Sequence, residues 1–217
     1  MTTSAVREGD LRAAIAAERS ELAEVLSGQP PHFWDAPTLC AGWRVREVVA
    51  HMTMPFRYST ARFAAEILRS RGSFHRMADR CARRDAAAPA AELLAALRDN
   101  AGHPWKPPGG GLEGALVHDV IHGLDITVAG GIGRRVPECR LRIVLDVIAR
   151  PKTVKYFGAG LDGIELRADD IGWSFGSGTR LAGQAQDLAL VLSGRRLPAG
   201  HLRGEPSARF TDASSRR

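Results

Sequence analysis

Apolar residues recur at helical spacing along the first two thirds of the chain. In the first such stretch, Leu11, Ile15 and Leu22 fall three or four residues apart or at multiples of that spacing, and Gly28 follows the last apolar position. This periodicity is typical of helices that bury one face. Read in this way, the pattern predicts helices over residues 7–27, 45–71, 73–84, 89–101, 112–129 and 138–149. Pro55 should kink or restart the second of them, because proline removes an interior hydrogen bond.

The pattern changes after about residue 158. Apolar and polar residues alternate around Ile164 and Leu166, and again from Ile171 to Phe175, with glycine-rich turns between the runs. Alternation of this kind predicts two or three short strands. A last helix is expected over Ala185–Leu192. Helices followed by a small mixed region indicate an α+β chain.

We expect three segments along this α+β chain. A helical bundle should cover residues 1–155, and a small αβ domain should cover residues 156–202. Residues 203–217 are polar and rich in arginine, so a disordered tail is the prediction for them.

The chain of 217 residues carries a net charge of +6, and six arginines against two acids after residue 194 supply four of these charges. Because no nucleic-acid-binding motif accompanies them, we do not expect nucleic acid as a partner. The arginines between residues 69 and 84 are interpreted as a solvated helix face, with a surface for an anionic partner left as the alternative.

No apolar run is long enough for a membrane span, and no secretory signal opens the sequence, so a cytoplasmic protein is expected.

Histidines carry the most informative chemistry. His118 and His122 are four residues apart in one predicted helix, so their rings lie on the same face. His51 lies beside the apolar stripe of another predicted helix and is the best candidate for a third ligand. Three neutral imidazoles would leave one position of a tetrahedral zinc ion open, as in catalytic sites. The alternatives are a chance pair on a helix and an ordinary core histidine.

Three motifs resemble one protein family. They are WDAPTLCAGWRVREVVAH over Trp34–His51, LVHDVIHGLDI over Leu116–Ile126, and GQAQDLALVLSGRR over Gly183–Arg196. Their content and order resemble the DinB/YfiT-like metal-binding superfamily, in its actinobacterial, mycothiol-dependent maleylpyruvate isomerase-like branch. The resemblance implies a DinB-like four-helix bundle with a metal on His51, His118 and His122, followed by a small αβ domain.

The resemblance also implies roles for two residues outside the triad. Arg195 matches a family position that reaches the site, where it would hold a substrate carboxylate; a helix-end arginine is the alternative. Asp125 would accept a ring N–H of a ligand histidine, and a surface carboxylate is the alternative. Asp119 is expected to be solvated or paired with an arginine. The branch has glutamate where this chain has His118, so the metal centre here would be one unit more positive.

Two functions are therefore considered. The first is a divalent-metal-dependent transferase or isomerase that uses a mycothiol-type thiol on a small anionic or electrophilic molecule, with zinc preferred and nickel an alternative. The second is a non-catalytic DinB-like module that binds a metal or ligand. The resemblance is compatible with a homodimer.

A rival signal is the GxSxG motif over residues 172–176, followed by Asp187 and His201. We discount a hydrolase because its nucleophile requires a turn from a strand into a helix, and here a strand pattern continues through the motif.

Overall fold

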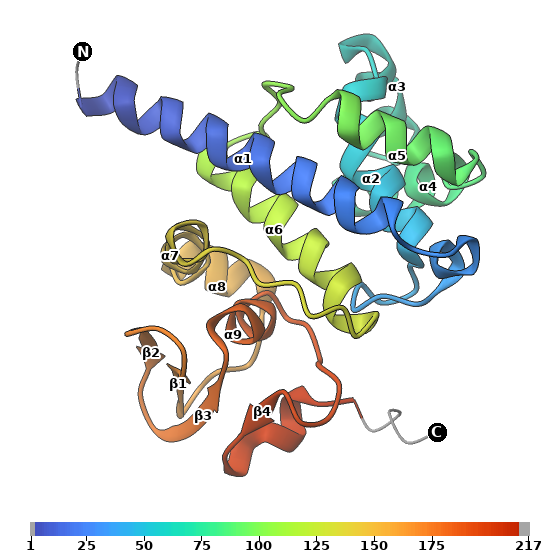
Figure 1. Cartoon of the computed structure of the whole chain (residues 1–217). Coiled ribbons are helices and arrows are strands. Elements are labelled where there is room, and N and C mark those ends of the chain that lie inside the picture. Colours follow the sequence, from blue (N-terminus) through green and yellow to red (C-terminus); the bar gives the residue numbers. More distant parts are fainter. Residues whose placement is uncertain (1–2, 213–217) are drawn as a thin grey trace. The chain divides into compact units, whose positions relative to one another are not determined.

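The computed structural model describes residues 3–212, and the side chains from residue 8 onwards (Figure 1). The chain divides into two compact units, Met1–His122 and Gly123–Arg217, which we call the N-terminal and C-terminal units. The division falls inside helix α6 (Gly111–Ala129). Our sequence-based boundary after residue 155 differs from it. Helix α7 (Glu138–Ile148) packs against α9 (Ala185–Leu192), within the C-terminal unit.

The N-terminal unit is a helical bundle. Besides the first part of α6, its helices are α1 (Thr3–Ser27), α2 (Val45–Arg57), α3 (Thr60–Arg69), α4 (Phe74–Asp85) and α5 (Ala90–Asp99), with a 3-10 turn over Pro31–Asp35. Helix α5 packs against α1 and α2, and side chains of α6 contact both α1 and α2. These contacts close a ring of four helices, which confirms the predicted four-helix bundle. Leu22, Val48 and Leu97 lie fully buried at its centre.

Pro55 acts as the sequence predicts. The expected helix over residues 45–71 is two helices, and Pro55 lies in the last turn of α2. Tyr58 is extended, and the side chain of Ser59 accepts a hydrogen bond from the backbone N–H of Arg62 to start α3. The first part of α2 is uninterrupted, and this part positions His51.

The C-terminal unit holds a small mixed sheet. Its strands β1 (Ile164–Ala168), β2 (Ser174–Gly176), β3 (Thr179–Gly183) and β4 (Leu202–Arg203) lie in the order β2-β1-β3-β4. Strands β1 and β3 are parallel, with Leu166 opposite Leu181, and the outer pairs are antiparallel. Helix α9 packs on β1 and β3, and all eight of its residues are buried. The predicted α+β class is confirmed.

Helix α8 (Pro151–Phe157) is an element that the sequence analysis missed. Pro151 follows the predicted helix over residues 138–149, and a proline just after a helix is typical of a helix end. It occupies the first turn of α8, where its fixed φ suits a helix and its missing N–H costs nothing.

The predicted disordered tail is wrong for residues 203–212. Leu202 pairs with Gly183 across β4 and β3, and a 3-10 helix follows over Glu205–Phe210. Pro206 and Phe210 are buried, and the backbone N–H of Leu197 donates to the carbonyl of Phe210 at 2.8 Å. Two apolar side chains therefore anchor a stretch whose composition is mostly polar. Residues 213–217 lie outside the described part of the chain.

Candidate metal centre

The structure brings together the three histidines that the sequence singled out. His51 lies on α2, and His118 and His122 lie one turn apart on α6. One ring nitrogen from each lies within 4.8 Å of the other two. Nε2 of His51 is 3.2 Å from Nε2 of His118, and the ring of His122 is centred 5.0 Å from that of His51.

This spacing fits a shared ion. Two nitrogens bound tetrahedrally to zinc at about 2.0–2.1 Å lie about 3.3 Å apart, close to the separation of the His51 and His118 nitrogens. Burial, and then the neighbouring His122 and His118 rings, hold the pKa of His51 well below its usual value. The ring is thus neutral at physiological pH, which is the form that binds a metal. His118 and His122 are only half-buried, so one side of the cluster is open to a further ligand.

Asp119 orients one of the three rings. Its Oδ1 lies 2.9 Å from Nδ1 of His118, so the carboxylate accepts a hydrogen bond from the Nδ1–H group. This proton position leaves Nε2 of His118 with its lone pair directed at the cluster. Metal-binding histidines commonly have such a carboxylate partner, and it raises the basicity of the ring.

Arg19 holds Asp119 in place. Its Nε donates to Oδ2 of Asp119 at 2.7 Å, and the two side chains are only 0% and 1% exposed. Of the two alternatives predicted for Asp119, a solvated carboxylate or a pair with an arginine, the arginine pair is correct, and it is buried. One signal could have revealed it: Arg19 lies on the buried face of α1, between Ile15 and Leu22 and beside the equally buried Glu18.

The same guanidinium also fixes a loop next to the site. Nη1 of Arg19 donates to the carbonyls of Ala101 and His103, at 3.2 and 2.8 Å. This loop carries Trp105, whose ring packs edge-on against His118 with centroids 5.1 Å apart. The Phe56 ring lies 4.8 Å from the guanidinium carbon. Arg19 therefore connects the ligand helix to the aromatic wall of the site.

Trp43 forms a second aromatic wall. Its ring is centred 5.0 Å from that of His51 and 6.4 Å from that of His122. The indole Nε1 donates to Oδ1 of Asp79 at 2.8 Å, which fixes the ring. No protein group bonds the buried Nδ1 of His51 in the part of the chain described, so packing against Trp43 sets that ring's position. Two indoles thus limit the access of water to the three nitrogens.

Arg195 and Asp125 pair with each other in the C-terminal unit. Asp125 is fully buried, and its two carboxylate oxygens accept from Nε and Nη2 of Arg195 at 2.8 and 2.9 Å. Nη1 of Arg195 donates to the carbonyl of Ser193, just after α9 ends. The guanidinium is thus engaged within its own unit. Contact of Arg195 with a substrate, and of Asp125 with a ligand ring, stay predictions.

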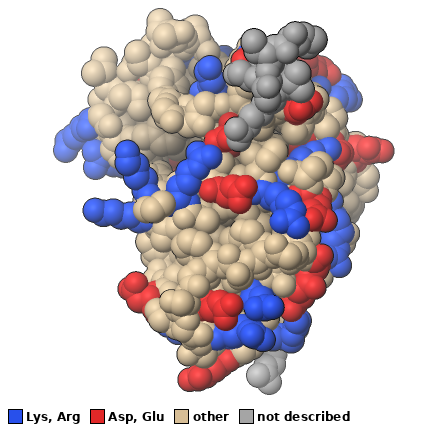
Figure 2. Space-filling model, turned by 90° about the vertical axis from the view of Figure 1, so that its left-hand side faces the viewer, with Lys and Arg blue, Asp and Glu red and all other residues tan. Residues whose placement is uncertain are grey.

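Three of the four arginines of α4 pair with acidic side chains within the N-terminal unit. Glu66 on α3 is buried and accepts from Arg84 at 2.7 Å and from Arg80, and Arg83 bonds Asp79 at 2.9 Å. Such pairing compensates the charges and favours a solvated face over a surface for an anionic partner. Figure 2 draws the left-hand side of Figure 1, where basic and acidic side chains lie among uncharged ones. None of the helices described is long and apolar enough to span a membrane.

Comparison with known proteins bears on this geometry. Residues 15–103 match the family model of the mycothiol maleylpyruvate isomerase N-terminal domain. The predicted family is confirmed over this segment. The matched segment contains His51, Trp43 and Arg19, and it ends before His118.

Two solved structures are similar to the chain. They are the mycothiol-dependent maleylpyruvate isomerase and a histidine-to-alanine mutant of that isomerase, at 14% and 15% sequence identity. Each alignment covers 92% of this chain and 93% of the other, with a TM-score of 0.49. No curated protein matches the sequence.

Proposed function

We propose that this chain is a divalent-metal-dependent enzyme that uses a mycothiol-type thiol to transform a small electrophilic molecule, as a transferase or an isomerase. The observation that carries the proposal is the convergence of three imidazole nitrogens at a half-open site. The buried carboxylate of Asp119 orients the His118 ring, and the indole of Trp43 packs against the His51 ring. The match of residues 15–103 to the N-terminal domain of the isomerase family supports the choice of thiol.

His51, His118 and His122 would hold the ion through one nitrogen each. A bound divalent ion lowers the pKa of a thiol that approaches it, so that the nucleophilic thiolate exists at neutral pH. Asp119 keeps the proton of His118 on Nδ1 and away from the site. Trp43 and Trp105 exclude water from the side of the cluster that they cover, which strengthens electrostatic interactions there.

The all-histidine ligand set has a consequence for the choice of ligand. Three neutral imidazoles leave the full charge of a divalent ion in place, whereas a glutamate ligand would cancel one unit of it. An anionic group such as a thiolate is therefore bound more strongly than at a site with two histidines and one carboxylate. Zinc suits imidazole ligands in a tetrahedral arrangement, and nickel is the alternative.

Metal content and thiol-dependent turnover test the proposal together. Purified wild-type protein, His122→Ala and the exposed-residue control His32→Ala are compared by elemental analysis and by turnover of maleylpyruvate or an aromatic halide with mycothiol. We expect about one ion per chain in the wild type and the control, and loss of both metal and turnover in His122→Ala. Bound metal without thiol-dependent turnover of any electrophile would favour the non-catalytic module, and absence of metal would contradict the proposal.

A further inference from the structure

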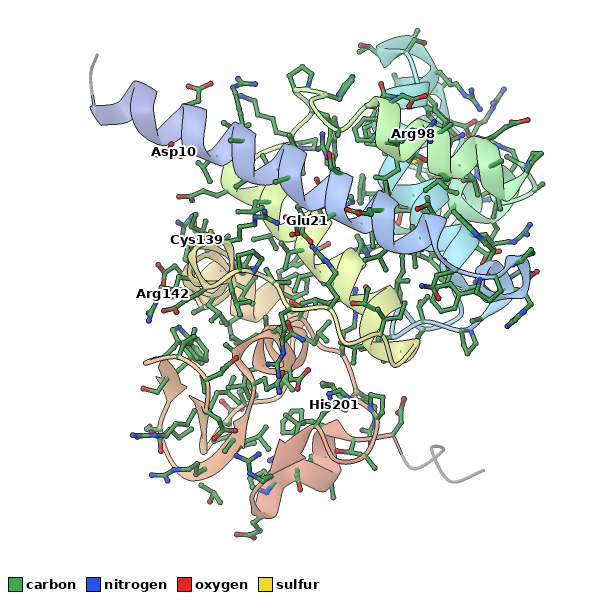
Figure 3. All side chains as sticks on the ribbon, in the orientation of Figure 1. Asp10, Glu21, Arg98, Cys139, Arg142 and His201 are labelled. Carbon is green, nitrogen blue, oxygen red and sulfur yellow. The ribbon has the colours of Figure 1, made fainter. Side chains whose placement is uncertain are left out.

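A cavity of about 490 Å³ lies entirely within the C-terminal unit. The segment after α6, the start of α9 and the segment before β4 line it, and His201 lies in the last of these (Figure 3). Its volume falls within the range of about 300–1,000 Å³ that is typical of small-molecule sites. The cavity shares no residue with the histidine cluster, which belongs to the N-terminal unit.

The charged side chains in the wall of this cavity are mostly basic. Arginines at positions 134, 135 and 203 line it, together with His201, and Asp187 is the single acid in the lining. Arg203 is paired with Asp169 at 2.5 Å. Arg135 is exposed and forms no ion pair with the residues described. At least one uncompensated cation therefore faces this space.

Asp187 and His201 form an oriented pair in this wall. Oδ2 of Asp187 lies 3.1 Å from Nδ1 of His201, and the Asp187 residue is only 3% exposed. Its Oδ1 is buried and has no hydrogen-bond partner among the residues that the structure describes, so His201 is the group that balances the buried carboxylate. The hydrogen bond to Asp187 raises the pKa of His201, against the opposing effect of burial. In the protonated ring Nδ1 donates to Asp187, so Nε2 is the ring nitrogen that can donate to a ligand.

Glycines leave room beside the backbone of the same cavity. A Cβ at Gly131, Gly133 or Gly200 would meet no atom within 4 Å. Gly131 and Gly200 also have positive φ values of 65° and 93°, which disfavour any other residue. Open backbone, a fixed imidazole and a free guanidinium are the elements with which proteins bind oxyanions.

We propose that this cavity binds a small organic molecule through a carboxylate or phosphate group, held by Arg135 and by Nε2 of His201. Asp187 is the positioning residue, which fixes the ring and supports its positive charge. The volume exceeds that of a bare oxyanion, so the rest of the ligand lies along the glycine segments and the side chain of Gln184.

Titration with inorganic phosphate, phenyl phosphate and benzoate tests this site, with binding measured by calorimetry in every variant and the His201 ring resonance followed by NMR wherever His201 is present. The wild type is compared with Arg135→Gln, with His201→Asn, which can still donate to Asp187, and with the control Arg167→Gln outside the cavity. We expect dissociation constants of about 1 mM or tighter for at least one organic probe. Each cavity variant should weaken binding about tenfold, as expected for one charge-assisted hydrogen bond, and the control should not.

Three results would overturn the proposal. They are a His201 resonance unmoved by every probe, binding that both cavity variants retain, and binding that Arg167→Gln weakens equally. Preference for phenyl phosphate or for benzoate identifies the oxyanion. The titration is repeated in His122→Ala, where binding of the probes should persist. Failure of the metal proposal can therefore be distinguished from failure of this one.

Discussion

The substitution Asp119→Asn removes one negative charge from the buried pair behind the candidate metal centre. The amide has almost the same volume as the carboxylate, so packing is preserved. Arg19 is 0% exposed and then lacks the charge that compensates its guanidinium. The single amide oxygen must also serve both Arg19 and Nδ1 of His118, whereas the carboxylate offers a separate oxygen to each.

The expected loss of stability follows from the burial of the pair. Breaking a buried ion pair by removing one partner costs about 3–5 kcal/mol, because an unpaired charge is left behind. The asparagine oxygen retains one hydrogen bond, so we expect a value near the lower end, about 3 kcal/mol. Metal affinity should fall about 10–100-fold, because the proton of His118 is no longer confined to Nδ1.

Two measurements on purified protein check these values. Urea unfolding of the metal-free protein gives the free energy of unfolding, and competition with a chromophoric chelator gives the metal affinity. Asp99→Asn is the matched control, since Asp99 forms an exposed pair with Arg98 and its loss should cost at most about 1 kcal/mol. Adding Arg19→Met to Asp119→Asn should recover part of the lost stability, because the buried charge is then gone. If Asp119→Asn alone is as stable as the control Asp99→Asn and its metal affinity is unchanged, this reasoning is refuted.

Two further predictions concern the C-terminal unit. The raised pKa of His201 means that its bond to Asp187 stabilises the fold fully below the unfolded-state pKa of about 6.5, and that this stabilisation is lost as pH rises through the higher folded-state pKa. The stability difference between wild type and His201→Asn should therefore shrink from pH 5.5 to pH 9 in urea unfolding; a constant difference would contradict the assignment. Phe210→Ala should cost about 3 kcal/mol or somewhat less, because a ring that is 6% exposed is removed from the core. A cost below about 0.5 kcal/mol would show that the segment after β4 does not pack.

The helices could be predicted from the sequence because the apolar residues on the buried face of each helix recur at helical spacing. The interpretation of residues 112–129 placed His118 and His122 on one face, and α6 spans almost the same residues. The four-helix architecture came from the resemblance of the three motifs to a known family. The convergence of His51 with the other two rings followed from that architecture, and the structure shows it.

The features that the sequence analysis missed depend on contacts between elements. The partner of His118 is the adjacent Asp119, which points toward α1 only because Arg19 is buried there. Pro151 marks a helix end as readily as a helix start, so α8 could not be separated from α7 by pattern alone. The ordered segment after β4 is anchored by single apolar side chains such as Phe210, which carry no periodic signal.

The direct test of the account is X-ray absorption of the zinc-loaded protein, with His122→Ala for comparison. The account predicts about one zinc per chain, with nitrogen neighbours at about 2.0–2.1 Å that include three imidazoles in the wild type and two in the variant. A wild-type protein that retains no zinc after dialysis, or an imidazole count that His122→Ala leaves unchanged, would contradict it.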